Sequence, residues 1–223
     1  MDLMVDIETF GIGSKAVIHE IGAVIFDPYG APLGENPDAS VTFHALVDPQ
    51  SCFNLGMEVD WSTLKFWFSQ GPLHMARLTA GPRTHIANVL MNFSEWVDKH
   101  KPKHKWGHGA TFDPIILHEY YKKLRKPSPF EDFRTIRDTR TLFDEVSDIT
   151  RAEWDSLCTR QMYHHPLHDA WAQARCVQFV KQQLLEMYKR SHDGNSSGAR
   201  GIPGRDSSDT SGGGTHGEVP PAA

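Results

Sequence analysis

Cysteine is scarce in this chain. Only three cysteines occur among 223 residues, at Cys52, Cys158 and Cys176, and no two of them form a C-x-x-C pair. An odd and unpatterned set of cysteines indicates neither a disulfide framework nor a zinc knuckle. Because such a set suits a reducing compartment, we expect a cytoplasmic location.

Long apolar runs are also absent. No stretch reaches the about 18 consecutive apolar residues that a membrane-spanning helix requires. The first residues lack the basic-then-apolar pattern of a secretory signal, so we expect no membrane partner. Excess positive charge is missing as well, because the net charge is −5. That value does not indicate a nucleic-acid binder, although local charge matters more than the sum.

Aromatic residues are missing from the end of the chain. Residues 191–223 contain eight glycines, six serines and three prolines, and no aromatic residue. A segment of this composition cannot bury enough apolar surface to offset the entropy lost on ordering. We therefore expect one domain over residues 1–190 and a disordered tail over 191–223.

The first 190 residues carry alternating strand and helix signals. Apolar stretches at 2–8, 16–27 and 41–48 predict three strands, and the short gaps between them favour antiparallel pairing. Apolar residues at helical spacing predict helices over 59–70 and 86–97, after Asp113, and from 167 to about 190. Short strands are predicted at 104–109 and 133–137. The fold class is therefore α/β, with a five-stranded mixed sheet of three antiparallel and then two parallel strands, flanked by helices.

Two carboxylates interrupt the first apolar strand, in "MVDIETF". Asp6 and Glu8 stand two residues apart, so they point to the same face of a strand. Their apolar neighbours occupy both faces, which argues for a central strand and against a solvated edge. Two carboxylates held so close repel each other unless a cation lies between them, and hard divalent cations prefer oxygen ligands.

The next segment, "GIGSKA", fits the glycine pattern of a dinucleotide-binding turn. That motif requires a helix directly after the glycines. Here the residues that follow are strand-like, and the acidic pair just before the loop would repel a pyrophosphate. The pattern therefore does not predict a dehydrogenase.

Two further segments carry candidate site residues. Asp113 follows the short strand in "WGHGATFD", where it would cap the next helix and Pro114 would take its first position. Asp169 lies in the first turn of the last helix, in "YHHPLHDAWAQA". His164 stands five residues earlier, on the preceding loop. A histidine in such a place suits general-base chemistry, whereas the alternative is that His164 and its neighbours only decorate a surface loop.

Together these segments identify a family. The pattern D-x-E, then W-G-x-G-x-x-F-D, then H-x-x-L-x-D-A resembles the DnaQ-like 3′–5′ exonuclease superfamily in its DEDDh branch, within the phage-type exonuclease VIII and exoribonuclease-like group. The resemblance covers residues 1 to about 188 and includes "VDWSTLKFWFSQ" and "FRTIRDTRTL". It implies a ribonuclease-H-like fold, which agrees with the strand order expected above.

The resemblance also implies a site. Two divalent cations, Mg²⁺ or Mn²⁺, would be held by four carboxylates, with His164 as general base in a two-metal hydrolysis of phosphodiesters that releases nucleoside 5′-monophosphates from a 3′ end. The implied ligands are Asp6, Glu8, Asp113 and Asp169. The implied partner is a nucleic acid with a 3′ end, single-stranded or overhanging, and a homo-oligomer is left open.

Substrate contacts are expected beside these residues. Thr9 and Phe10 directly follow the first motif, where relatives contact the terminal sugar or base. His108 stands where the group more often has Asn, so a substrate contact can differ there. Pro166 stands where Ala is commoner, a small departure because a first helical turn tolerates proline. Three aromatic residues of the segment 59–70 are expected in the core: Trp61, Phe66 and Trp67.

Basic residues gather around the third carboxylate. Eight lysines and arginines lie within residues 99–126, where they serve either as a phosphate-binding surface or as ordinary solvated helix ends. Two other functions compete with an exonuclease. One is a catalytically inactive nucleic-acid-binding module on the same fold, and the other is a small-phosphate hydrolase. The five intact motif residues count against the first alternative.

Overall fold

The computed structural model describes residues 1–145 and 164–193. Its centre is one five-stranded sheet in the order β3-β2-β1-β4-β5. β2 pairs antiparallel with β1 and β3, whereas β4 is parallel to β1 and β5 is parallel to β4. The predicted ribonuclease-H-like mixed sheet is thus confirmed. The strands are β1 (Asp2–Thr9), β2 (Ile18–Phe26), β3 (Thr42–Leu46), β4 (Lys105–Gly107) and β5 (Ile136–Asp138).

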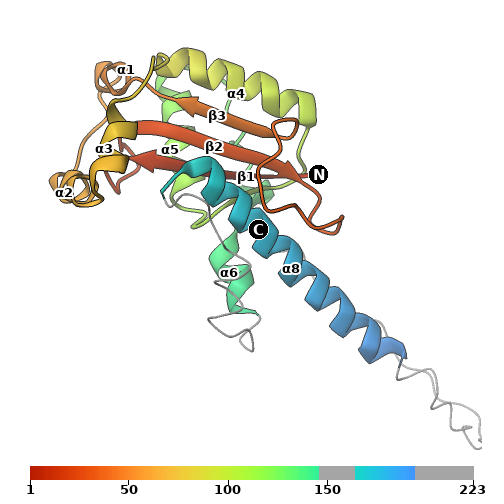
Figure 1. The fold of residues 1–223 in the computed structure, drawn as a ribbon. Helices are drawn as coiled ribbons and strands as arrows, with labels where there is room; N and C mark the ends of the chain where they lie inside the picture. Colours follow the sequence, from red (N-terminus) through yellow and green to blue (C-terminus); the bar gives the residue numbers. More distant parts are fainter. Residues whose placement is uncertain (146–163, 194–223) are drawn as a thin grey trace, which may run out of the picture. The chain divides into compact units, whose positions relative to one another are not determined.

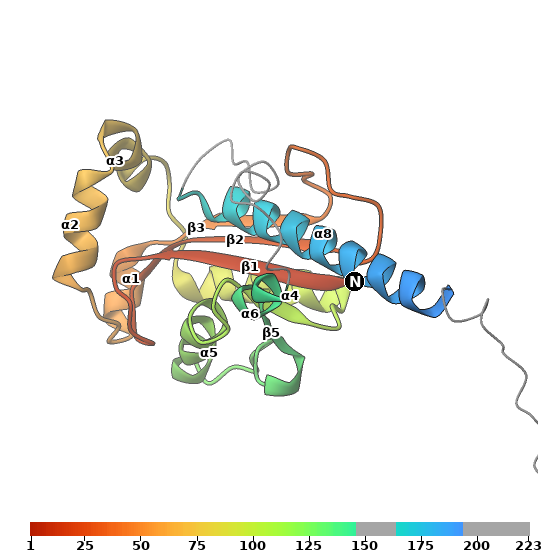
Figure 2. The ribbon, with the colours of Figure 1, turned by 90° about the horizontal axis from the view of Figure 1, so that it is seen from below.

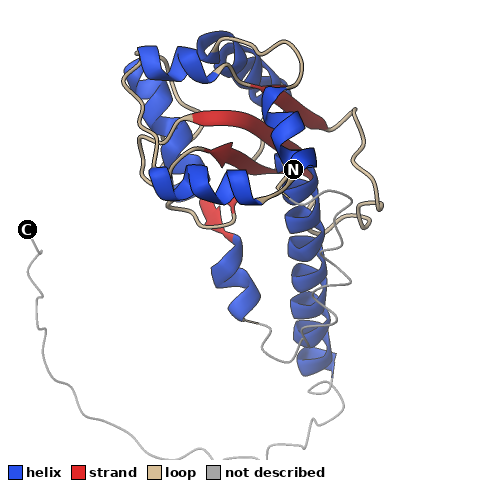
Figure 3. Ribbon diagram, turned by 60° about the vertical axis from the view of Figure 1, so that its left-hand side comes forward, coloured by secondary structure: helices blue, strands red, loops and turns tan. Residues whose placement is uncertain are grey.

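Helices cover both faces of the sheet (Figure 1, Figure 3). Seen along the sheet edge in Figure 2, the first turns of α8 lie over one face and α4 and α5 lie over the other, while α2 and α3 stand at one end. The helices are α1 (Pro49–Asn54), α2 (Trp61–Ser69), α3 (Pro72–Thr79), α4 (Ile86–His100), α5 (Asp113–Lys123), α6 (Thr139–Asp144) and α8 (Pro166–Asp193), with a 3₁₀ turn η1 (Phe133–Thr135) before β5.

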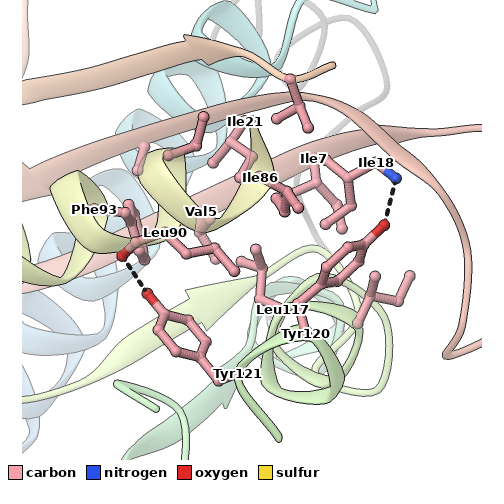
Figure 4. Close-up of a cluster of buried hydrophobic side chains, with 14 of the residues drawn as sticks. Val5, Ile7, Ile18, Ile21, Ile86, Leu90, Phe93, Leu117, Tyr120 and Tyr121 are labelled. Atoms are coloured by element: carbon pink, nitrogen blue, oxygen red, sulfur yellow. Dashed lines mark hydrogen bonds between the residues drawn. The ribbon is translucent and has the colours of Figure 1, made fainter. Parts of the chain in front are cut away.

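The larger core fills the space between the sheet and the helices α4 and α5. Odd-numbered residues of β1 and β2, such as Val5 and Ile21, point into it and meet Leu90 and Phe93 of α4. Figure 4 shows that two tyrosines of α5 close this core. The Tyr120 hydroxyl accepts from Ile18 N at 2.9 Å and donates to the carbonyl of Ala16, and Tyr121 donates to the Leu90 carbonyl at 3.0 Å. Satisfying the hydroxyls in this way lets both rings be buried.

A smaller core lies on the opposite face, beneath α8. Met4, Val24 and Phe26 of the sheet pack there against Ala170 and Trp171. The even-numbered residues of β1 face this side, so Asp6 and Glu8 lie on the α8 face. The alternation of one strand thus places apolar residues in one core and carboxylates beneath a helix.

Gly22 lets α8 approach this face closely. It pairs with Asp6 across β1 and β2. A Cβ atom at position 22 would come within 2.1 Å of the Leu167 nitrogen and 2.2 Å of the Pro166 carbonyl carbon. Because those are backbone atoms, any larger side chain would push the start of α8 away from the sheet.

Several local expectations can now be compared with the structure. Asp60 caps α2 by accepting from Ser62 N. Asp113 is the first residue of α5 and not its cap, because its carboxylate turns toward β1. Of the three aromatic residues expected in the core, only Trp67 is buried. Trp61 is 65% exposed and Phe66 is 40% exposed, because α2 is covered on one side only.

The chain divides into two compact units, residues 1–186 and 187–223. The expected boundary near 190 therefore falls inside the last helix, which continues to Asp193, and the expected tail beyond that helix lies outside the described residues.

The cysteines differ in their chemical state. Cys52 is a free buried thiol, whereas Cys176 is disulfide-bonded, a pairing that the sequence did not indicate. Within the two described ranges, no helix has the length and apolar content to cross a membrane.

Candidate active site

Three carboxylates meet at the carboxyl end of β1. Asp6 and Glu8 come from the strand and Asp169 from the first turn of α8. One oxygen of each lies within 4.8 Å of the other two. The packing of α8 on the sheet thus brings together residues that are more than 160 positions apart in the chain.

Asp113 approaches the same place from α5. Its Oδ1 accepts a hydrogen bond from Ile7 N at 3.1 Å, so the carboxylate is attached to the strand between Asp6 and Glu8. Its Oδ2 would lie 3.2 Å from a Cβ atom at Gly107, which shows how closely it packs on the end of β4. The fourth predicted ligand therefore stands beside the other three.

The electrostatics of this cluster are unfavourable without a cation. Burial raises the pKa of Asp6 well above its ordinary value, and the charges of Asp113, Glu8 and Asp169 add to the effect. Burial and the charge of Asp169 likewise raise the pKa of Glu8. Burial raises the pKa of Asp113 to about 7. Buried carboxylates that repel one another in this way favour either protons or a bound cation.

One polar neighbour steadies the cluster. Gln173 lies one helical turn after Asp169 on α8, and its Nε2 donates to Asp6 Oδ1 at 2.9 Å. Its Oε1 is buried and has no hydrogen-bond partner among the described residues. The i, i+4 spacing from Asp169 was a signal in the sequence that could have pointed to Gln173.

A cavity of about 360 Å³ opens beside Glu8. Its walls come from the end of β1, the loop that follows, and α2. Trp67 fixes this wall, because its indole Nε1 donates to the Thr9 carbonyl at 2.8 Å. The lining residues are Ile7, Glu8, Thr9, Gly11, Ile12, Ser62, Thr63, Phe66, Trp67 and Phe112. Phe112 is the fixed aromatic residue of the W-G-x-G-x-x-F-D motif, but sequence reasoning gave it no role, because nothing in the chain order links it to α2.

His164 packs against two aromatic residues that line this cavity. Its ring lies edge-on to Phe66 at 5.1 Å and to Trp67 at 5.9 Å between centroids, and both of those residues line the cavity with Glu8. The backbone of His164 has a φ of 53°, in the left-handed region, and its carbonyl accepts a hydrogen bond from Arg77 of α3. The loop before α8 therefore places the imidazole against Phe66 and Trp67, just outside the residues that line the cavity.

The two neighbouring histidines point elsewhere. His165 is buried against Glu20, with its Nε2 3.8 Å from Glu20 Oε1, and its ring stacks on His44 at 4.7 Å. Burial lowers the pKa of His165 to about 4. His168 lies edge-on to His165. The three histidines therefore have different environments and do not simply lie on a surface loop.

The expected substrate residues are placed as follows. Thr9 lines the cavity and donates its hydroxyl to the Gly11 carbonyl at 2.6 Å. Phe10 is half-buried and stacks on His19, with centroids 4.6 Å apart. His108 lies behind Asp113, with its Nδ1 2.8 Å from the Thr139 hydroxyl.

Comparison with known proteins places this site in a family. The model of the Rv2179c-like 3′–5′ exoribonuclease domain matches residues 1–181, a span that contains all four carboxylates and His164. The chain belongs to this family. The DnaQ-like, DEDDh-type recognition made from the motifs is confirmed.

Two individual proteins are similar to this member of the Rv2179c-like family. An exodeoxyribonuclease of Enterobacteria phage T4 is 25% identical over 139 residues, which are 56% of this chain and 57% of that protein. The alignment thus spans a little over half of the curated relative. The crystal structure of the nuclease domain of 3′hExo, a DEDDh family member bound to rAMP, is 12% identical with a TM-score of 0.48, covering 83% of this chain and 91% of that one.

Members of DEDDh nuclease families use divalent metals, and the residues present in this Rv2179c-like chain fit such ions. The donors are carboxylate oxygens, which Mg²⁺ and Mn²⁺ prefer. Burial and the charges of neighbouring carboxylates raise the pKa values of Asp6 and Glu8, and a bound cation would offset that repulsion. The residues that sequence reasoning missed are those whose role depends on neighbours across the sheet, namely Glu20, Gly22 and Arg77.

Proposed function

We propose that the chain is a divalent-cation-dependent 3′–5′ exonuclease that releases nucleoside 5′-monophosphates from the 3′ end of a nucleic acid. One observation carries the proposal. Three carboxylates from β1 and α8 meet within 4.8 Å of one another, and one of them, Glu8, lines a cavity of about 360 Å³. A negatively charged cluster beside an open cavity would repel a phosphodiester unless cations were bound.

The cations would be held by Asp6, Glu8 and Asp169, together with Asp113, whose carboxylate accepts a hydrogen bond from Ile7 N next to Asp6. When bound, two such ions supply the positive charge that stabilises the attacking and leaving oxygens of an in-line displacement. Gln173 holds the Asp6 carboxylate through a hydrogen bond of 2.9 Å, so this ligand is oriented in advance.

His164 would accept the proton of the attacking water. An imidazole is suited to this role because its ordinary pKa, about 6.5, lies near neutral pH. Its placement supports the role, since the ring contacts Phe66 and Trp67, which border the same cavity as Glu8. The Arg77 hydrogen bond to the His164 carbonyl would keep the ring facing the cavity.

The cavity would receive the terminal nucleotide. The exposed ring of Phe66 offers a stacking surface, and Ser62 and Thr63 offer hydroxyls for the sugar. Phe10 would offer a second aromatic ring to the terminal nucleotide, and this ring is held in place by stacking on His19. The family description names an exoribonuclease and the phage relative is an exodeoxyribonuclease, so both nucleic acids are candidate substrates.

A product analysis tests the proposal. The full chain is incubated with Mg²⁺ or Mn²⁺ and 5′-labelled single-stranded RNA, single-stranded DNA, and duplexes of each with 3′ overhangs. We expect a ladder shortened from the 3′ end and mononucleotides as the product. Asp6→Asn should reduce turnover to background because it removes a carboxylate that faces all the others. Glu58→Gln is the control, because that carboxylate is exposed and only pairs with Lys15.

Three results would count against the proposal. Mononucleotide release that persists in excess EDTA would exclude a cation-dependent reaction. Internal cleavage would exclude an exonuclease. Tight binding of single strands by the unmodified chain, with no release under any ion, would instead indicate a nucleic-acid-binding module.

A further inference from the structure

A second group of metal-binding side chains lies next to the carboxylate cluster, one strand away. Glu20 of β2, His44 of β3 and His165 at the start of α8 each direct one ligand atom to a common point, and these atoms lie within 4.8 Å of one another. Within the described residues, this is the only such group apart from Asp6, Glu8 and Asp169. Glu20 pairs directly with Glu8 across the two strands, so the two groups share one face of the sheet.

We propose that Glu20, His44 and His165 form a second cation site, distinct from the carboxylate cluster and selective for a transition ion such as Zn²⁺ over Mg²⁺. Two imidazole nitrogens and one carboxylate oxygen are a donor set typical of Zn²⁺ and other late transition ions. Mg²⁺ prefers an all-oxygen shell, which the neighbouring cluster supplies. A fourth position would remain for water, because His44 lies on the exposed side of β3.

The present contacts are close to those of a ligand set. His44 Nε2 lies 2.7 Å from Glu20 Oε1, and His165 Nε2 lies 3.8 Å from the same oxygen. Without an ion, a proton on His44 bridges the first pair as an ordinary hydrogen bond. An ion between the three atoms would take the place of that proton, and small side-chain rotations would bring the donors to bonding distance.

His165 supplies the independent observation. The residue is 8% exposed, and its Nδ1 has no hydrogen-bond partner among the described residues. Buried polar atoms are nearly always hydrogen-bonded, so no network of hydrogen bonds among the described residues accounts for the place of this imidazole. Its Nε2 lies 3.8 Å from Glu20 Oε1, beyond hydrogen-bond distance, a separation that two ligand atoms of one ion can have.

Arg77 is compatible with the site. Its Nε lies 3.4 Å from Glu20 Oε2, the oxygen that does not face the histidines. The guanidinium therefore orients the carboxylate and leaves Oε1 for the ion, as outer-shell partners of metal ligands commonly do. The bound ion would link β2, β3 and the start of α8, the segment that also carries His164 and Asp169.

A titration with Zn²⁺ tests this site. The full chain is placed in excess Mg²⁺, which occupies the carboxylate cluster, and Zn²⁺ binding is followed by calorimetry. The same experiment with Co²⁺ adds the visible spectrum, which reports nitrogen ligation. We expect one saturable Zn²⁺ site per chain, and a higher thermal midpoint with Zn²⁺ than with Mg²⁺ alone. His44→Ala should weaken Zn²⁺ binding about tenfold or more, and Asp169→Asn should leave that binding unchanged.

His104→Ala is the matched control. His104 also faces a buried carboxylate, Asp2, at 3.2 Å, but it belongs to neither ligand group found in the described residues. His44→Ala is the decisive variant for the proposed Zn²⁺ site, because the partly exposed ring of His44 can be removed without disturbing the core. Unchanged Zn²⁺ binding in His44→Ala would overturn the proposal. So would the absence of a saturable site, or a site lost in Asp169→Asn, which would place the ion in the carboxylate cluster.

Discussion

At the scale of single residues, the loop before α8 separates three neighbouring histidines. His164 turns toward Phe66 and Trp67 beside the cavity, whereas His165 turns back against Glu20 and His168 follows it on the helix. The backbone between these side chains is unusual, because His164 has a φ of 53°, in the left-handed region. Only one of the three rings thus packs against residues that line the cavity beside Glu8.

The first prediction concerns this histidine. His164→Ala should lower kcat by about 10²–10⁴, the usual effect of removing a positioned general base. Mg²⁺ affinity should change little, because His164 is not among the proposed ligands. Steady-state kinetics with a short labelled oligonucleotide measures the first quantity, and Mg²⁺ titration of activity measures the second.

His168→Ala is the control for this variant. It lies on the same short segment, and its loss should keep kcat within about tenfold of the unmodified chain. A large loss of kcat in His168→Ala together with a nearly unchanged kcat in His164→Ala would refute the assignment of His164 as the general base and the alignment of the last motif.

At the scale of elements, the site exists because α8 can lie close to β2. Gly22 removes the side chain that would otherwise meet the backbone of residues 166 and 167. The same glycine lies opposite Asp6, so the close approach occurs where Asp169 must reach β1. The packing of one helix on one strand therefore sets the distance between the carboxylates.

The second prediction follows from that contact. Gly22→Ala should shift the start of α8, because the new Cβ would lie within 2.2 Å of two backbone atoms. A displacement of the order of 1 Å can cost about 100-fold in rate, and overpacking costs about 1–3 kcal/mol of unfolding free energy. Activity and urea unfolding of the variant check both effects. Gly13→Ala is the control, because nothing lies within 4 Å of a Cβ there; equal effects of the two variants would contradict the packing argument.

At the scale of the whole molecule, burial of the carboxylates of Asp6, Glu8 and Asp113 opposes folding when no cation is bound. The raised pKa values mean that the folded state holds protons that the unfolded state has released. Two buried histidines act in the opposite sense, since burial lowers the pKa of His19 to about 3 and that of His165 to about 4. The carboxylates and the histidines therefore change the unfolding free energy in opposite directions as the pH rises.

The third prediction is a pH dependence in EDTA. The two histidines make the unfolding free energy rise with pH, and this rise is complete near the pKa of about 6.5 that histidine has in the unfolded chain. Above that pH only the carboxylate contribution changes, and the unfolding free energy should fall between about pH 6.5 and about pH 8, by an amount of the order of 1 kcal/mol. Asp6→Asn should flatten this fall, because it removes one carboxylate and its repulsion of the others.

Urea unfolding followed by tryptophan fluorescence measures this dependence. Saturating Mg²⁺ is the control, because bound cations should remove most of the fall. A free energy that rises with pH over this range, or an equal slope in Asp6→Asn, would show that the cluster is not under electrostatic stress.

The fourth prediction concerns the end of the chain. Removal of residues 191–223 should leave the thermal midpoint and the hydrolysis of short oligonucleotides unchanged. The family match ends at residue 181 and the compact first unit at 186, and the removed segment has no aromatic residue. Thermal unfolding and activity of the shortened chain, beside the full chain, provide the measurement. A clear loss of either property would show that the segment contributes to the domain.

The sequence by itself determined which carboxylates share a strand face and how the sheet begins. Asp6 and Glu8 could be assigned to one face because side chains alternate strictly along a strand, whereas Asp169 was named through the resemblance to the family motif. The antiparallel pairing of the first three strands followed from gap lengths, since short gaps favour antiparallel neighbours, but the place of β4 beside β1 did not. The same local reasoning failed at Asp113, read as a helix cap, because a distant strand nitrogen attracts its carboxylate.

Only the tertiary structure decided what lies across from each residue. Trp61 and Phe66 have the apolar character of core residues, yet they are exposed because α2 packs on one side only. Glu20 lies opposite Glu8 because of the register between β1 and β2. His165 lies near Glu20 because the start of α8 packs closely on Gly22. Periodicity reports the face on which a side chain lies, whereas the partner on that face depends on long-range pairing, which no local pattern contains.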